Sequence, residues 1–121
     1  MATRELEVAV REREGMAVID LLGDVNATAE AALQRGYAEA THSGARSIAL
    51  NFAGTDYINS TGIALIVGLL AQARSHGVEV RAYGLSDHYR EIFEITRLAD
   101  FMTIADTEDG AVSGAEGRRD G

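Results

Sequence analysis

Small polar side chains gather in the segment DYINSTG, which runs from Asp56 to Gly62. Asp56, Asn59, Ser60 and Thr61 fall within six positions, directly before a long apolar run. Asn, Ser and Thr at the start of a helix accept hydrogen bonds from the first backbone N–H groups, which lack helical partners. A single residue is enough for such a cap. The segment therefore holds more polar chemistry than capping alone requires.

The hydroxyl of Ser60 suits a second role, because a phosphate is tolerated at the positive end of a helix dipole. A phosphoserine carries about −1.5 to −2 charges and changes the surface that a partner meets. The fold itself need not change. Two interpretations of the segment therefore stay open at this point: a helix cap, or a phosphorylation switch at a protein–protein interface.

The sequence contains no motif for serine-nucleophile catalysis, metal binding or nucleotide binding. A serine nucleophile needs a base and an oxyanion site, and no GxSxG or comparable motif surrounds Ser60. His42, His76 and His88 are far apart along the chain and lack the spacing of metal ligands. Neither GxxxxGK[ST] nor GxGxxG is present. We expect no enzymatic activity, no catalytic residues, and no metal, nucleotide or other cofactor.

The net charge of −8 and the pI of about 4.7 argue against a nucleic-acid partner, because binding to a phosphate backbone relies on clustered Lys and Arg. The sequence has no cysteine, which excludes disulfides and thiolate metal sites. Its longest apolar run, 63–71, is too short to span a bilayer, and the first ten residues lack the apolar core of a signal peptide. We therefore expect a cytoplasmic protein without a membrane span.

Hydrophobic periodicity predicts that strands alternate with helices along the chain. Residues 6–11 alternate as an edge strand, and a Glu14-Gly15 turn leads into a strand buried on both faces. One predicted helix starts at about Thr28 and buries Ala31, Ala32, Leu33, Tyr37 and Ala40. The predicted strands are 6–11, 16–22, 47–52, 78–83 and 101–105, and the predicted helices are 28–43, the segment from the polar cluster to about 76, and 86–96.

These elements predict an α/β fold of one domain, since 121 residues are too few for two ordinary ones. Helical connections between strands favour parallel pairing with right-handed crossovers. We expect a mixed, mostly parallel sheet of about five strands with an antiparallel N-terminal edge strand and helices packed against it. Residues 113–121 are rich in Gly and charge, so we expect a disordered tail there.

The helix after the polar cluster is apolar on nearly all sides. The predicted inward stripe consists of Ile63, Ile66, Val67 and Leu70. Leu65 and Leu69 form a second apolar face. Burial on both sides within the fold and a docking surface beside Ser60 both explain this pattern. Gly68 in the middle of the helix costs roughly 1 kcal/mol against Ala, which favours close approach of another backbone.

Three segments resemble the STAS domain, a family of bacterial anti-sigma factor antagonists and sulfate-transporter tails. They are GDVNATAEAAL, DYINSTGIALIVGLL and YREIFEITRLADFMTIADTEDGAV. The resemblance covers nearly the whole chain and implies a STAS domain over residues 1–112. In the family, an anti-sigma factor serine kinase phosphorylates a hydroxyl that corresponds to Ser60, and a PP2C-type phosphatase removes the phosphate. The unphosphorylated antagonist binds the kinase and so frees a sigma factor.

The resemblance also implies a partner-binding surface around Ser60. Its residues would be Asp24, Asn26, Asp56, Asn59, Thr61 and Gly62. Asn26 and Asn59 stand where the family commonly has Asp, which removes two carboxylates near the modified hydroxyl. Two interpretations stay open: easier accommodation of a phosphate, or a member with weak or absent phosphorylation. The alternative is a STAS structural subunit of a transporter or stress-signalling complex, without a phosphoswitch. A homodimer also stays open.

Overall fold

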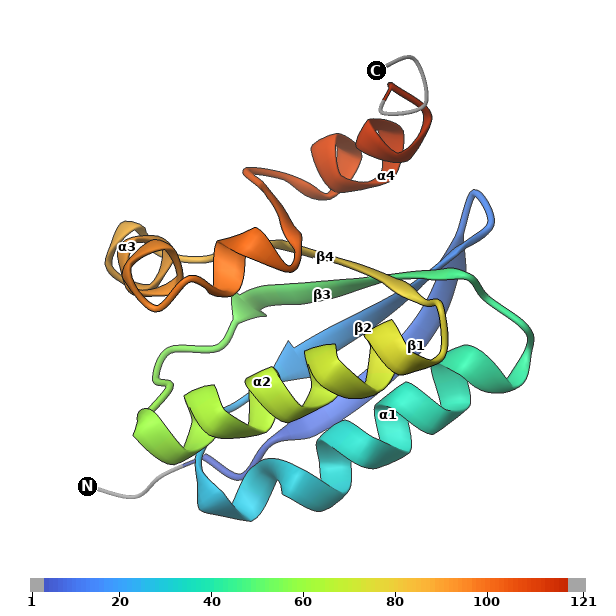
Figure 1. The fold of residues 1–121 in the computed structure, drawn as a ribbon. Coiled ribbons are helices and arrows are strands. Elements are labelled where there is room, and N and C mark those ends of the chain that lie inside the picture. Colours follow the sequence, from blue (N-terminus) through green and yellow to red (C-terminus); the bar gives the residue numbers. More distant parts are fainter. Residues whose placement is uncertain (1–3, 118–121) are drawn as a thin grey trace.

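The computed structural model describes residues 4–117, and the side chains of 4–113. Strands and helices alternate along the chain, as Figure 1 shows. The strands are β1 (Glu7–Arg13), β2 (Met16–Leu22), β3 (Ser47–Gly54), β4 (Glu79–Tyr83) and β5 (Thr103–Ala105). The helices are α1 (Glu30–His42), α2 (Ser60–Ser75), α3 (Asp87–Ile95) and α4 (Glu108–Gly117), with short 3-10 turns η1 (Ala27–Ala29) and η2 (Leu98–Asp100).

The five strands form one sheet in the order β1-β2-β3-β4-β5. Strands β1 and β2 pair antiparallel, and every other neighbouring pair is parallel. Glu14 and Gly15 link β1 to β2 with positive φ angles of 53° and 83°, as a two-residue hairpin turn requires. The predicted mixed sheet with its antiparallel N-terminal edge strand is confirmed.

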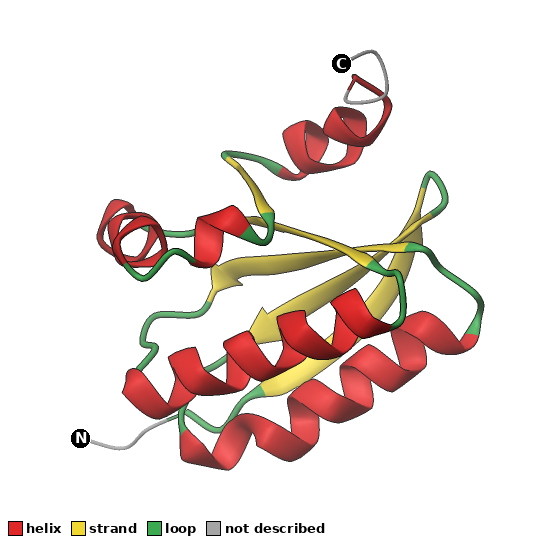
Figure 2. Ribbon diagram, in the orientation of Figure 1, coloured by secondary structure: helices red, strands yellow, loops and turns green. Residues whose placement is uncertain are grey.

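Helices α1 and α2 cover one face of the sheet, and α4 lies against the other face (Figures 1 and 2). Alternate residues of β2 therefore enter two different apolar clusters. Ile19 and Leu21 pack with Ile66 and Leu69 of α2 in the larger cluster, whereas Val18 belongs to the smaller cluster beneath α4. This layering fixes α2, and with it the polar segment at its start, against the main core.

Helix α4 was not among the predicted elements. Its Ala111 and Val112 are buried against Met16, Val18 and Ala49 of the sheet. The segment from Ser113, which we expected to be disordered, thus begins inside α4, and residues 118–121 lie outside the described part of the chain. The boundary of the STAS domain at residue 112 stays a prediction.

Ion pairs fasten the start of α4 to the sheet. The Glu108 carboxylate accepts hydrogen bonds from Arg11 (2.8 and 3.0 Å), from Arg13 (2.8 Å) and from the Tyr83 hydroxyl (2.9 Å). These donors, the Arg11 guanidinium above all, hold the pKa of Glu108 well below its ordinary value. Arg81, only 1% exposed, donates to the Ala111 carbonyl at 2.9 Å. Charged side chains thus anchor a helix that buries few apolar groups.

Three details of the predicted helices are wrong. Ala31 is exposed, because α1 turns Ala32 and Leu33 toward the sheet instead. On α2, Val67 is 47% exposed while Leu69 is buried, so the buried stripe is rotated away from Val67. A Cβ added at Gly68 would meet no atom within 4 Å, so no backbone approaches it. The inward stripe therefore runs through Gly62, Ile66, Leu69, Leu70 and Ala73.

Candidate functional site

Two loops meet at the edge of the sheet where β2 and β3 end. The strands are parallel, so their carboxyl ends lie at the same edge. The Val25 N–H donates to the Tyr57 carbonyl at 2.9 Å, and the Asn59 N–H donates to the Val25 carbonyl at 3.2 Å. A parallel bridge joins Val25 to Ile58. The GDVN turn and the start of α2 are therefore held side by side.

Gly62 makes this approach possible. A Cβ built on Gly62 would lie 2.0 Å from the Val25 carbonyl oxygen and 2.7 Å from its carbon. Both atoms belong to the backbone, which cannot yield as a flexible side chain can. Gly62 is buried, and Val25 is fully buried beneath the loop. Any larger residue at this position would force the first turn of α2 away from the GDVN turn.

The two asparagines that depart from the family pattern both act as helix caps. The Asn59 side-chain oxygen accepts a hydrogen bond from the Gly62 N–H at 2.8 Å, and so caps α2. The Asn26 side-chain oxygen accepts from the Thr28 N–H at 3.0 Å, and so caps η1. Both residues are half-buried. An aspartate would offer the same acceptor with an added charge.

Ser60 is the first residue of α2 and is exposed, as is Thr61 beside it. Within the described residues, the Ser60 hydroxyl makes no side-chain hydrogen bond, because Asn59 already supplies the cap. Among residues 4–113, whose side chains the structure describes, no base lies in hydrogen-bonding contact with that hydroxyl. What the arrangement offers is an accessible hydroxyl at the positive end of a 16-residue helix.

The two aspartates of the predicted surface both contact Arg4. Asp24 is half-buried and accepts a hydrogen bond from the Arg4 backbone N–H at 3.1 Å. Asp56 is exposed, and its carboxylate lies 3.9 Å from the Arg4 guanidinium. The second contact joins side chains that are 84% and 63% exposed and contributes little stability. All seven predicted residues nevertheless lie on the two adjoining loops or the first turn of α2.

Four residues of this region were not predicted. Val25 and Arg4 hold the loops in place, and Leu22 and Tyr57 are large side chains left 44% and 50% exposed beside them. Val25 carried a signal, since it is an apolar residue in an otherwise polar turn. Nothing in the sequence indicated that Leu22 would be exposed, because it lies at the end of the apolar run MAVIDLL, which predicts a strand buried on both faces.

The part of the chain that the structure describes contains no group of three His, Cys, Asp or Glu side chains that could hold a metal ion. None of its helices is both long and apolar enough to cross a membrane. The predicted absence of a cofactor stays a prediction.

The model of the STAS domain matches residues 7–111 of this sequence. The chain belongs to the STAS domain family. That assignment agrees with the predicted resemblance and with the fold described above.

Two relatives of this STAS domain bear the names of anti-sigma factor antagonists. BtrV of Bordetella bronchiseptica is 26% identical over 108 residues, which are 89% of this chain and 93% of BtrV. The anti-sigma-B factor antagonist of Staphylococcus aureus is 38% identical over 61 residues, 50% of this chain and 56% of the relative. The second match therefore spans only about half of each protein.

Solved structures share the fold of this STAS domain. The unphosphorylated form of the Bacillus anti-sigma factor antagonist SpoIIAA matches with a TM-score of 0.68 at 20% identity, covering 93% of this chain and 98% of that one. Its phosphorylated form matches with a TM-score of 0.66 at 22% identity, covering 89% of this chain and 98% of that one. A sulfate transporter family protein from Wolinella succinogenes matches with a TM-score of 0.75 at 13% identity, covering 92% of this chain and 93% of that one. At such low identities, these matches show a shared fold and no shared function.

Proposed function

We propose that this STAS domain is an anti-sigma factor antagonist that works by partner switching. In its unphosphorylated form it binds an anti-sigma factor serine kinase through the surface around Ser60 and so frees a sigma factor. Phosphorylation of Ser60 by that kinase ends the complex, and a PP2C-type phosphatase restores binding. The protein acts through this association and not through catalysis.

The main observation behind the proposal is that different residues cap α2 and present a hydroxyl at its start. Asn59 caps the helix, and Ser60 is exposed, with a hydroxyl that makes no side-chain hydrogen bond among the described residues. A phosphate there would sit at the positive end of the helix dipole, where it is tolerated. The names of the two relatives and of SpoIIAA support the choice of an anti-sigma factor as the partner.

The predicted surface residues have different roles in this proposal. Exposed Asp56 and Thr61 contact the partner directly, and the half-buried Asp24 borders the same surface. Asn59 and Gly62 act indirectly, because they set the position of Ser60. The last predicted residue, Asn26, shapes the adjoining turn.

A phosphate on Ser60 would weaken the complex through its own charge. At the centre of an interface, an added anion loses hydration and repels any carboxylate that it meets. The cap residues Asn26 and Asn59 add no negative charge on this side of the contact, so the helix start accommodates the phosphate more easily. The fold is expected to persist while the affinity for the partner falls.

A capture experiment tests this proposal. Wild type, Ser60→Ala and Ser60→Glu serve as baits in a lysate of the source cell, and mass spectrometry quantifies the bound proteins. We expect wild type and Ser60→Ala to retain an ATP-binding anti-sigma factor kinase and Ser60→Glu to lose it by at least tenfold. Ser75→Glu adds the same charge at the exposed far end of α2 and should bind as wild type does.

Phosphosite mapping after incubation with the captured kinase and ATP completes the test. Phosphate at Thr61 alone, or at neither residue despite an active kinase, would contradict the assignment to Ser60. A permease or ATPase complex that binds wild type and Ser60→Glu equally would instead support the structural-subunit alternative.

A further inference from the structure

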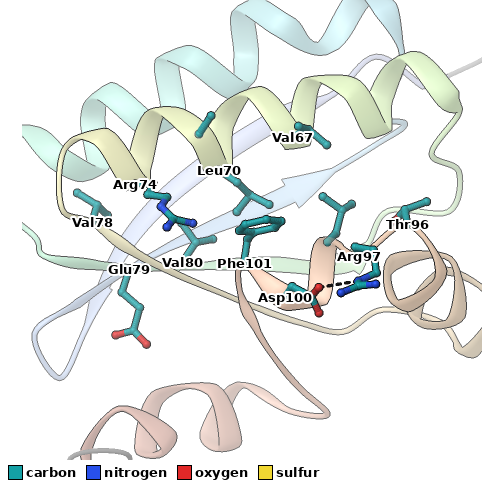
Figure 3. A pocket seen from close by; sticks show the side chains of 12 residues that line it. Val67, Leu70, Arg74, Val78, Glu79, Val80, Thr96, Arg97, Asp100 and Phe101 are labelled. Atoms are coloured by element: carbon teal, nitrogen blue, oxygen red, sulfur yellow. Dashed lines mark hydrogen bonds and ion pairs between the residues drawn. The ribbon is translucent and has the colours of Figure 1, made fainter.

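A groove of about 510 Å³ runs along the C-terminal half of α2, away from Ser60. Its other wall is the segment from Thr96 to Phe101, which includes η2 (Figure 3). The floor is apolar, since Leu70, Val80 and Leu98 are all buried there. A volume of this size lies within the usual range of small-molecule sites, which are mostly apolar with a few polar groups.

Two large apolar side chains of the groove remain in contact with water. Phe101 is 57% exposed on one wall, and Val67 is 47% exposed on the other. In Figure 3 the Phe101 ring points across the groove toward Leu70. A ligand that covers these side chains would remove apolar surface from water, which stabilises a complex.

Both carboxylates that line the groove pair with an arginine, but one arginine of the groove has no carboxylate partner among the described side chains. The carboxylate of Asp100 pairs with Arg97 at 2.6 Å, and that of Glu79 accepts from Arg81 at 2.9 Å. Arg74 makes no ion pair with any side chain that the structure describes, and its guanidinium lies 5.8 Å from the centre of the Phe101 ring. A cation without a carboxylate thus stands beside the apolar floor.

We propose that this groove binds a small amphiphilic carboxylate. The aliphatic part of the ligand lies over Leu70 and Phe101, and its carboxylate receives hydrogen bonds from Arg74. A single anionic group matches a single unpaired guanidinium. Twelve residues line the groove, whereas a protein partner of standard size contacts about 20–30 residues on each side. The inference does not depend on the proposed role of Ser60.

The test is a titration of the full chain with sodium octanoate, followed by the NMR shifts of backbone amides. We expect saturable shifts at 67–74 and 96–101, and an affinity that falls up to about fourfold for each CH2 group removed from the ligand. Arg74→Gln should weaken octanoate binding about tenfold and leave the binding of 1-octanol unchanged. Arg35→Gln removes an exposed arginine from α1 and should have no effect.

Three results would overturn the proposal. The first is the absence of saturable shifts along the groove. The second is an equal octanoate affinity for wild type and Arg74→Gln. The third is a failure of octanoate to bind while Val67→Asp weakens capture of the protein partner, which would make the groove a protein-docking surface. Loss of partner capture by Ser60→Glu tests the proposed function separately and has no bearing on the groove.

Discussion

Two helices of this domain are anchored near their first residues, α2 by close backbone packing and α4 by ion pairs. At α2, Gly62 lets the helix approach the Val25 carbonyl, and the Asn59 side chain caps the first turn. At α4, Glu108 accepts hydrogen bonds from Arg11, Arg13 and Tyr83, and Asp109 pairs with Arg13 at 2.5 Å.

The two helix starts differ in which side chains are left exposed. Because α2 is anchored by close packing at Gly62, the neighbouring Ser60 and Thr61 stay exposed and make no side-chain hydrogen bond within the described part of the chain. Anchoring by charge occupies the first side chains of α4 with contacts inside the domain. The proposed switch therefore needs the start of α2, whereas the start of α4 is held by contacts within the domain.

The largest expected effect comes from Gly62→Ala. Its methyl group would overlap the Val25 backbone, and we expect a loss of about 3 kcal/mol in the free energy of unfolding. Urea unfolding followed by circular dichroism measures this loss. An unchanged unfolding midpoint would show that the α2 anchor does not depend on close packing.

Glu108→Gln tests the ionic anchor of α4. Glu108 is 24% exposed, so we discount its hydrogen bonds for solvent and expect a loss of roughly 1 kcal/mol near neutral pH. Asp109→Asn alters a carboxylate that is 83% exposed and should change stability less. Hydrogen exchange of the α4 amides should rise in Glu108→Gln while that of α2 stays constant. Equal exchange in wild type and Glu108→Gln would contradict the anchor.

The stability difference between wild type and Glu108→Gln should depend on pH. Because the pKa of Glu108 is lowered by folding from an ordinary value of 4.5, its contribution is fully present above that value and is lost as the pH falls toward the folded-state pKa. Wild type should therefore lose stability between about pH 5 and pH 3 more steeply than Glu108→Gln. Urea unfolding at both pH values gives the comparison. Parallel pH profiles would show that the carboxylate is not held in its charged form.

Asn59→Ala removes the cap of α2 without touching the packed glycine. We expect a loss of about 1 kcal/mol, because the Gly62 N–H loses its acceptor. Asn59→Asp keeps an acceptor at this position and should be as stable as wild type. Thermal unfolding of the three proteins decides between a cap and a residue that serves only the partner surface. In the second case, Asn59→Ala would unfold at the wild-type temperature.

The smallest expected effect is a gain from Gly68→Ala. Open space surrounds Gly68, and alanine is favoured over glycine inside a helix by about 0.5–1 kcal/mol. Together with Gly62→Ala, this variant separates the two glycines of one helix by the sign of their effects. Destabilisation by Gly68→Ala would mean that a neighbour approaches the helix there after all.

The sequence alone determined the order and type of the main elements. Periods of two and of 3.6 residues are local properties, so the hairpin, the parallel strands and α1 to α3 could be predicted from them. The position of Ser60 at the start of α2 was predicted for the same reason, since a cap and the apolar run after it are neighbours in the chain. Gly77, with φ of 71°, follows the end of that helix, as is common for glycine.

Only the tertiary structure decided how distant segments meet. In the sequence, Gly62 and Gly68 look alike, and only the packing of the GDVN turn makes one indispensable and leaves the other in open space. The segment of α4 has little helical propensity, and its anchoring depends on arginines almost a hundred positions earlier. The groove beside Arg74 likewise needs α2 and η2 to pack together. Such contacts depend on the relative positions of whole elements, which no local periodicity encodes.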